Sequence, residues 1–164
     1  MQISKLHKVF LQNPSISTDS RRATKDSLFF ALKGENFNGN EYAEEAINKG
    51  CKYAIIDESK YKKNKNFILV KDCLKTLQEL ALFHRNTLNI PVIGITGSNG
   101  KTTSKELIYS CLSTELTTAF TKGNLNNHIG VRLSSLEISQ KHKIAIIEMG
   151  ANHEGEIKFL CEIA

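Results

Sequence analysis

Residues 91–103 read PVIGITGSNGKTT, and this stretch decides the fold. Its first part, Pro91 to Thr96, is the continuous apolar run expected of a parallel strand that is buried on both faces. Glycines at positions 94, 97 and 100 let the following backbone wrap closely and point its amides inward, while Lys101 adds a cation and Thr102 a hydroxyl. Helical spacing of apolar residues then continues to Leu112. A strand, a glycine-rich loop and a helix in this order are typical of a phosphate-binding loop.

The loop departs from the general pattern GxxxxGK[ST] at one position. The first glycine of that pattern would fall at position 95, which is Ile95 here. A glycine-rich turn without a ligand is therefore the alternative interpretation. If the loop binds a nucleotide, the residues expected to hold its phosphates are Gly97, Ser98, Asn99, Gly100, Lys101, Thr102 and Thr103.

A carboxylate follows the second apolar run of this half of the chain. Ile144 to Ile147 reads IAII, and Glu148 comes directly after it. Ligands of open α/β sheets collect at the carboxyl ends of strands, so Glu148 could hold magnesium opposite Thr102. One hydroxyl and one carboxylate are sufficient, because magnesium takes its other ligands from phosphate and water. The alternative is a glutamate that only caps the turn at Met149 and Gly150.

The remaining pattern predicts an α/β protein with two domains. One helix is expected to begin near Glu41 and to end at Gly50. A second helix is expected to begin near Asp72, which would be its N-cap. We expect a small α/β domain over residues 1–88 and, over 89–164, a doubly wound fold with a mainly parallel sheet. The short apolar runs expected to be strands of the first domain are Ser27–Leu32, Tyr53–Ile56 and Phe67–Val70.

Composition excludes several classes of protein. The chain has 164 residues, of which 40% are hydrophobic and 24% charged, as in ordinary globular proteins. No apolar run approaches the roughly 20 residues that span a bilayer. The four cysteines form no CxxC pair, which argues against zinc or a disulfide framework and favours a reduced, cytoplasmic setting. The net charge of +5 comes from scattered lysines, so we expect nucleotides rather than nucleic acid as anionic partners.

Two polar loops leave their roles open. Residues 121–130, TKGNLNNHIG, carry amides that could reach a phosphate, but a structural turn around Gly123 explains the same composition. Residues 17–22, STDSRR, could grip a nucleotide through arginine, or could be an exposed polar turn.

Taken together, these segments resemble the Mur ligases, ATP-dependent amide-forming enzymes of bacterial cell-wall synthesis. The family's loop is similar to TGxNGKT[ST], which explains the glycine offset. The segments GNLNNHIGV at 123–131 and EMGANHEGEI at 148–157 point to the branch that adds D-alanyl-D-alanine to UDP-N-acetylmuramoyl-tripeptide. The matching segments are TDSR at 18–21, LFFALKGENFNGNEY at 28–42, ITGSNGKTT at 95–103, GNLNNHIGV at 123–131 and EMGANHEGEI at 148–157.

The resemblance implies ATP and Mg²⁺ as cofactors and a role for each matching position. It implies that Lys101 contacts the terminal phosphates, that Thr102 and Glu148 hold the first magnesium, and that Asn126 and Asn127 lie near the reacting phosphate. The residues that it places in the uridine-nucleotide region are Ser17, Asp19, Ser20 and Arg21. It also implies a cytoplasmic, monomeric parent enzyme that works through an acyl phosphate.

The resemblance also sets limits on what this chain should do alone. The chain matches only the front third or so of such a ligase, so that residues 1–88 would be its uridine-nucleotide (UDP-MurNAc) binding domain and residues 89–164 the first part of its central ATP-binding domain. The family's carbamylated lysine and second-magnesium ligands would lie beyond Ala164. We therefore expect no activity from these residues alone, and weak stability or self-association from the incomplete sheet. Three positions depart from the family: Arg132 replaces a proline, and Asn38 and Asn40 replace an aspartate and a histidine.

Two rival functions remain at this stage. A folylpolyglutamate synthase would share the phosphate loop but should lack the uridine-binding front domain. A non-catalytic nucleotide-binding module would tolerate the loss of the Lys101 ammonium.

Overall fold

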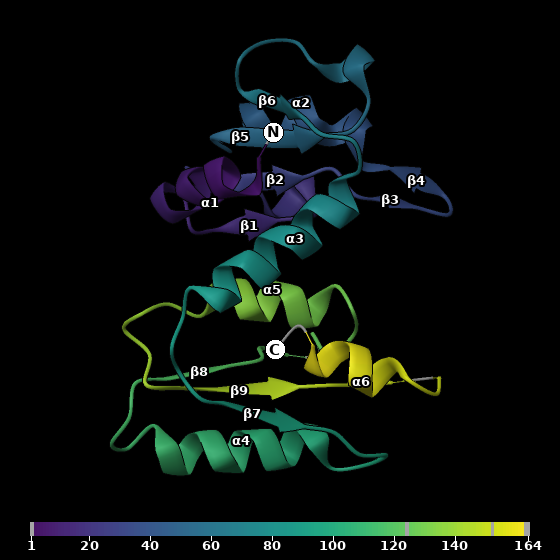
Figure 1. The fold of residues 1–164 in the computed structure, drawn as a ribbon. Coiled ribbons are helices and arrows are strands. Elements are labelled where there is room, and N and C mark those ends of the chain that lie inside the picture. The colour runs from purple at the N-terminus through teal and green to yellow at the C-terminus, as the bar shows by residue number, and fades with distance from the viewer. Residues whose placement is uncertain (1, 124, 152, 163–164) are drawn as a thin grey trace. The chain divides into compact units, whose positions relative to one another are not determined.

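A computed structural model describes residues 2–123, 125–151 and 153–162 and divides the chain into two compact units (Figure 1). The units comprise residues 1–80 and 81–164. The division along the chain falls between Leu80 and Ala81, inside helix α3 (Cys73–Asn86), whereas the domain boundary predicted from the sequence falls after residue 88. The helix was itself expected, and Asp72 caps it by accepting a hydrogen bond from the Lys75 amide at 2.8 Å.

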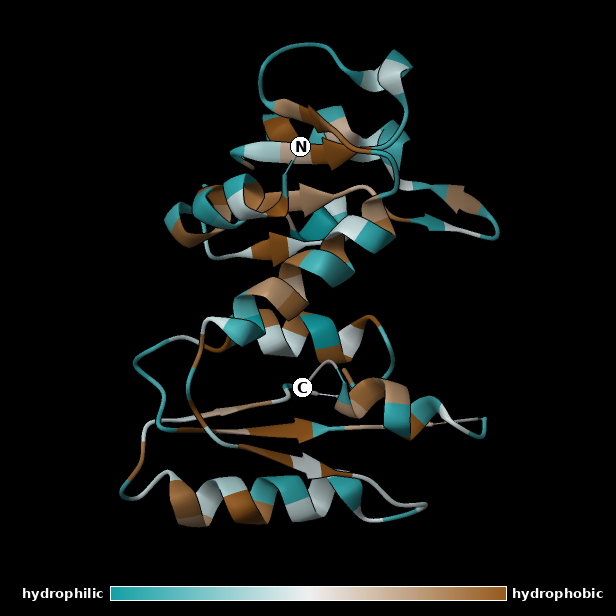
Figure 2. Ribbon diagram, viewed as in Figure 1, coloured by the Kyte–Doolittle hydropathy of each residue, from teal (hydrophilic) through white to brown (hydrophobic). Residues whose placement is uncertain are grey.

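The first unit is built on a parallel sheet of four strands in the order β1-β2-β5-β6. Parallel strands need crossover connections. Helix α2 lies in the connection between β2 and β5, whereas 3-10 turns lie between β1 and β2 and between β5 and β6. Figure 2 shows that the strands are mostly hydrophobic whereas the helices alternate between hydrophobic and hydrophilic residues. The elements of this layer are α1 (Ile3–Gln12), β1 (Ile16–Ser17), β2 (Leu28–Phe30), α2 (Ala43–Asn48), β5 (Tyr53–Ile56) and β6 (Phe67–Leu69).

Small elements follow the carboxyl ends of several of these strands. A two-stranded antiparallel hairpin, β3 (Lys33–Gly34) with β4 (Phe37–Asn38), follows β2. Three short 3-10 turns complete the unit: η1 (Ser20–Arg22), η2 (Gly39–Tyr42) and η3 (Ser59–Tyr61).

The second unit contains a three-stranded parallel sheet in the order β7-β9-β8. The central strand β9 is buried from Ala145 to Glu148. Its core also includes Val131 and Leu160, which lie in α5 and α6. The elements are β7 (Val92–Ile95), α4 (Lys101–Leu112), β8 (Thr118–Phe120), α5 (Gly130–Glu137), β9 (Ile144–Glu148) and α6 (Glu156–Cys161).

The α/β class with parallel sheets is confirmed, but two burial predictions are wrong. Strand β7 is only half-buried, with Gly94 exposed, because it is one of the two outer strands of the described sheet and pairs there only with β9. Apolar residues at helical spacing up to Leu112 should share a buried face of α4, but two of them, Leu107 and Cys111, are exposed. Within the described residues, no helix is long and apolar enough to cross a membrane.

Candidate nucleotide-binding site

The glycine-rich loop joins β7 to α4 and ends in a left-handed residue. Gly97 has φ +146° and Gly100 has φ +75°, and both values favour glycine. Gly100 is the N-cap of α4, so the helix begins at Lys101. The first amides of a helix lack intrahelical partners and, with the helix dipole, favour an anion at this end. The loop and helix therefore have the local geometry that the sequence predicted for a phosphate site.

Lys101 is turned back over this loop. Its ammonium donates to the carbonyl oxygens of Gly97 at 2.6 Å and Ser98 at 3.4 Å. The side chain thus holds its positive charge directly beside the backbone expected to surround the phosphates.

Thr102 and Glu148 are in direct contact. The threonine hydroxyl lies 3.2 Å from Oε1 and 3.0 Å from Oε2 of Glu148, whose residue is 1% exposed. Strand pairing explains the contact, because Glu148 is in register with Ile95 at the end of β7. The interpretation of Glu148 as a cap for the following turn is wrong. The turn's amides use other acceptors: Met149 donates to Ile95 and Gly150 donates to Asn126.

Asn126 completes this contact, whereas Asn127 has a different place. The Asn126 amide donates to Oε1 of Glu148 at 2.9 Å. Gly150 permits this approach, since a Cβ there would lie 3.1 Å from the Asn126 side chain. The Asn127 side-chain oxygen accepts the amides of Ile129 at 3.1 Å and Gly130 at 2.8 Å, which anchors the start of α5.

Sequence reasoning missed Lys105, the only buried residue of α4. Its ammonium lies 3.6 Å from Oε2 of Glu148 and donates to the carbonyl of Gly123 at 3.2 Å. The sequence did contain a signal for it. Lys105 lies three residues after Thr102 and four after Lys101, and residues at these spacings share one face of a helix.

No cluster of three or more His, Cys, Asp or Glu side chains that could hold a metal occurs among the described residues. A magnesium site here would therefore rest on one hydroxyl and one carboxylate. Thr102 and Glu148 provide oxygen ligands of the hard type that magnesium prefers, and they are already in contact.

The other predicted substrate residues lie in the first unit, beside a pocket of about 550 Å³. Ser17 is not part of its lining, and its hydroxyl donates to the Asp19 carbonyl at 2.7 Å. Both polar and aromatic side chains line the pocket, which is bounded by Thr18, Asp19, Ser20, Arg21, Phe29, Phe37, Gly39, Tyr42 and Glu45.

An ion pair forms the polar side of this pocket. Arg21 donates to both carboxylate oxygens of Asp19, from Nε at 3.0 Å and Nη2 at 2.8 Å. The side-chain hydrogen bond from Arg21 holds the pKa of Asp19 at about 2, below its ordinary 3.8. The Arg21 side chain is still 83% exposed, so it can contact a ligand. Ser20 donates to Glu45 at 3.2 Å.

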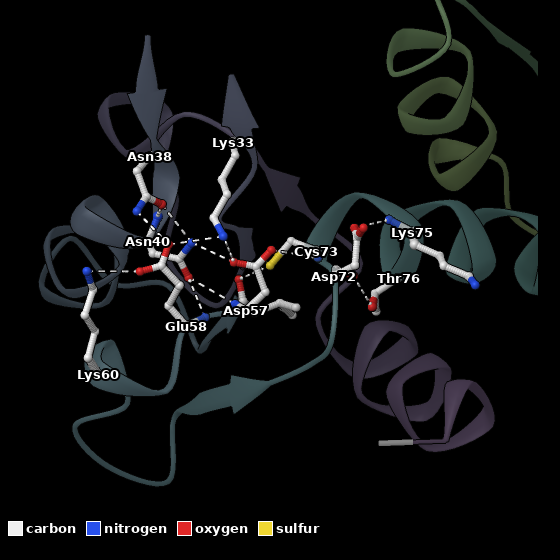
Figure 3. Close-up of polar contacts among 11 residues, drawn as sticks. Lys33, Asn38, Asn40, Asp57, Glu58, Lys60, Asp72, Cys73, Lys75 and Thr76 are labelled. Carbon is white, nitrogen blue, oxygen red and sulfur yellow. Dashed lines mark hydrogen bonds and ion pairs between the residues drawn. The ribbon is translucent and has the colours of Figure 1, made fainter. Parts of the chain in front are cut away.

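The two unusual asparagines, Asn38 and Asn40, belong to a structural network (Figure 3). Asn40 is 1% exposed and donates to Asp57 at 2.9 Å, while its oxygen accepts the Asp57 amide at 3.0 Å. Asn38 donates to Glu58 at 2.8 Å, and Lys33 pairs with both acids. Burial would raise the pKa of Asp57, but hydrogen bonds from Lys33 and Asn40 outweigh it and lower the pKa. The network fastens the β3–β4 hairpin to the end of β5.

The third departure, Arg132, lies buried in α5 at 2% exposure. It donates to the His128 carbonyl, and its guanidinium lies 5.0 Å from the Phe159 ring centre. Burial lowers its pKa. Asn124 of the loop 121–130 and Asn152 of the segment 148–157 lie outside the described residues.

Comparison with known proteins assigns both units to one family. A model described as Mur ligase family, catalytic domain, matches residues 14–85, and one described as Mur ligase middle domain matches residues 95–164. The chain belongs to the Mur ligase family. This confirms the resemblance that the sequence motifs indicated.

Individual family members agree over most of the chain. The UDP-N-acetylmuramoyl-tripeptide--D-alanyl-D-alanine ligase of Haemophilus influenzae is 38% identical over 157 residues, covering 93% of this chain and 34% of that ligase. A crystal structure of MurF from Acinetobacter baumannii gives a TM-score of 0.79 at 32% identity, covering 99% of this chain and 38% of that one. The MurF ligase from Thermotoga maritima in complex with ADP also gives 0.79 at 32% identity, over 94% and 36%. The chain thus spans about a third of the length of these family members.

Proposed function

We propose that this chain supplies the uridine-nucleotide and ATP-binding parts of a ligase that joins D-alanyl-D-alanine to UDP-N-acetylmuramoyl-tripeptide. The observation that carries the proposal is the Thr102 hydroxyl set against both oxygens of buried Glu148, beside a glycine-rich loop at the start of α4. The names of the relatives and the ADP bound to the Thermotoga maritima structure support it. The reaction is proposed for a protein that has the rest of the family's length as well.

The proposed chemistry is phosphoryl transfer followed by amide formation. The carboxylate of the tripeptide attacks the γ-phosphate of ATP, which gives an acyl phosphate and ADP, and the amine of D-alanyl-D-alanine then displaces phosphate. Catalysis of such a transfer depends on positioning and charge neutralisation rather than on a side-chain nucleophile. Magnesium held by Thr102 and Glu148 would neutralise phosphate charge.

The residues of the second unit have separate tasks in this proposal. The loop amides at the start of α4 bind the phosphates, and the ammonium of Lys101 moves from the Gly97 carbonyl to the terminal phosphates. Asn126, held against Glu148, lies on the side of the site where the γ-phosphate reacts. Asn127 keeps the loop before α5 in place through its side-chain oxygen, which accepts two amides, and a contact with the phosphate would use its side-chain NH2 group as the donor.

The pocket of the first unit is the proposed uridine-nucleotide site. A volume of about 550 Å³ is within the usual range of ligand pockets, and the lining combines aromatic side chains with an arginine. Phe29, Phe37 and Tyr42 offer apolar surface for a base, and Arg21 offers two donors for a phosphate. We place the whole activity in the cytoplasm. Free thiols at all four cysteines suit that compartment.

Binding of ADP and of UDP tests the two parts of the proposal. We expect this chain to bind Mg·ADP in titration calorimetry, and Lys101→Ala to weaken binding by about tenfold or more, as the loss of a charge-assisted phosphate contact implies. Lys122→Ala is the matched control, because Lys122 is an exposed lysine of the same unit that pairs with Glu137. UDP should bind as well, and more weakly after Arg21→Ala.

Each part can fail by itself. Equal binding of ADP by the unaltered chain and by Lys101→Ala would remove the phosphate-loop assignment. Binding of ADP without any binding of UDP would favour a relative that shares the loop but not the uridine site.

A further inference from the structure

Helix α4 buries a lysine and no other residue. Lys105 is 0% exposed, whereas the neighbouring Leu107 is 63% exposed. Charged side chains are almost never fully buried unless they are paired, because a buried charge loses its hydration. The one buried position of this helix is therefore occupied by an ammonium group, and apolar packing does not explain that choice.

The hydrogen-bond and ion-pair partners of Lys105 come from three separate segments, and its ammonium also lies 5.8 Å from the ring centre of Phe120 at the end of β8. The ammonium pairs with Oε2 of Glu148 at the end of β9, at 3.6 Å. It donates to the carbonyl of Gly123, in the loop after β8, at 3.2 Å. Its third partner is Glu106 on the same helix, at 3.2 Å, and the side chain of that glutamate is 53% exposed. Lys105 thus ties the helix that follows the phosphate loop to both segments that approach it.

These contacts fix the carboxylate of Glu148 from two sides. Lys105 lies at Oε2, while the amide of Asn126 donates to Oε1 at 2.9 Å. The hydroxyl of Thr102 faces both oxygens. A carboxylate held in this way faces Thr102 in a defined orientation. Lys105 balances its buried negative charge before a metal ion binds.

We propose that Lys105 is a positioning residue that orients Glu148, and the loop that carries Asn126, for a magnesium–nucleotide complex. The inference rests on the proposed function, since it concerns the same site. Lys105 acts through Glu148 and the Gly123 carbonyl and touches neither nucleotide nor substrate. Partners that orient a metal ligand in this way typically affect metal affinity by about 10- to 100-fold.

The test measures how much magnesium tightens the binding of a fluorescent ADP analogue to this chain. The ratio of the dissociation constants in EDTA and in magnesium is determined for the unaltered chain, for Lys105→Met and for Glu106→Gln. Methionine keeps an unbranched apolar stem but has no charge. We expect the ratio to fall about tenfold or more in Lys105→Met, with binding in EDTA largely retained. Glu106→Gln should keep the ratio, because the contacts of Lys105 to Glu148 and Gly123 remain.

The outcomes separate this inference from the function on which it rests. An unchanged ratio in Lys105→Met would overturn the inference and leave the nucleotide site standing. Failure of the unaltered chain to bind ADP in either condition would overturn the proposed function, and with it the role of Lys105.

A folding defect in Lys105→Met is itself informative. Removing one member of a buried pair leaves the other charge uncompensated, so the additional change Glu148→Gln should then restore folding. Circular dichroism of Lys105→Met and of the double variant measures this. A double variant that stays unfolded would make Lys105 a packing residue and contradict the proposal.

Discussion

The position of Glu148 in the fold was predictable from the sequence, but its contacts were not. Its position after an apolar run predicts a carboxylate at the carboxyl end of a strand, and the structure places it there. Its contacts to Thr102, Asn126 and Lys105 come from sequence separations of 46, 22 and 43 residues. Only the pairing of β7 with β9, and the path of the loop after β8, bring these groups to one point.

The Asp19 carboxyl should titrate at unusually low pH because Arg21 stabilises its charged form. With the pKa held at about 2 rather than 3.8, this ion pair favours the folded state above pH 3.8, and the benefit is lost as pH falls toward 2. We expect a carbon-detected NMR titration of Asp19 to show a midpoint near 2. Arg21→Gln should move that midpoint upward, toward 3.8. Arg22→Gln, a neighbouring loss of charge, should move it little, and a midpoint near 3.8 in the unaltered chain would contradict the ion pair.

At the scale of elements, Asn40 is a buried member of the network that holds the β3–β4 hairpin. Asn40 makes hydrogen bonds to Asn38 and Asp57 and accepts the amides of Asp57 and Glu58. Asn40→Ala removes all of these and leaves buried polar groups unpaired, which should cost about 3 kcal/mol of unfolding free energy. Asn66→Ala is the matched control, because Asn66 is only half-buried and its side chain makes one exposed bond to the Lys52 carbonyl.

Urea unfolding of the three proteins, followed by circular dichroism, measures these differences. The hairpin carries Phe37, which lines the pocket, so UDP binding should weaken in Asn40→Ala. Equal stability of the two variants would show that the network in Figure 3 does not hold the hairpin.

Elements with a strong local signal were predictable from the sequence. The β5 strand matches its predicted range of Tyr53 to Ile56, and α4 runs from Lys101 to Leu112 as its spacing predicted. Helix α1, strand β8 and helix α5 were not predicted. Strand β8 has three residues, and α5 places serines and Arg132 in buried positions, so neither gives the apolar pattern of a buried element. Their form depends on contacts with β9, which a local pattern does not contain.

The same limit applies to the candidate sites. The glycine loop, Thr102 and Glu148 follow a motif with fixed spacing and strand ends, so sequence predicts their proximity. The roles of Lys105 and Asn127 depend on how the loop 121–129 folds onto its neighbours, and no spacing rule describes that loop. Which ligands these sites take stays a prediction.

For the molecule as a whole, the outer strand β7 of the second unit predicts self-association. Within the described residues β7 pairs with β9, and the backbone on its other side is an open sheet edge. Exposed apolar side chains occur in the same unit, with Leu107 at 63% and Phe159 at 45%. Open edges and apolar patches favour contacts between copies, so we expect a concentration-dependent rise in sedimentation coefficient.

Leu107→Lys should reduce that rise, because the charge opposes association at α4. Leu11→Lys replaces a leucine that is 57% exposed on α1 of the first unit and should leave it unchanged. A monodisperse monomer up to high concentration would contradict the prediction, and an equal reduction by both substitutions would show that the association is not specific to the second unit.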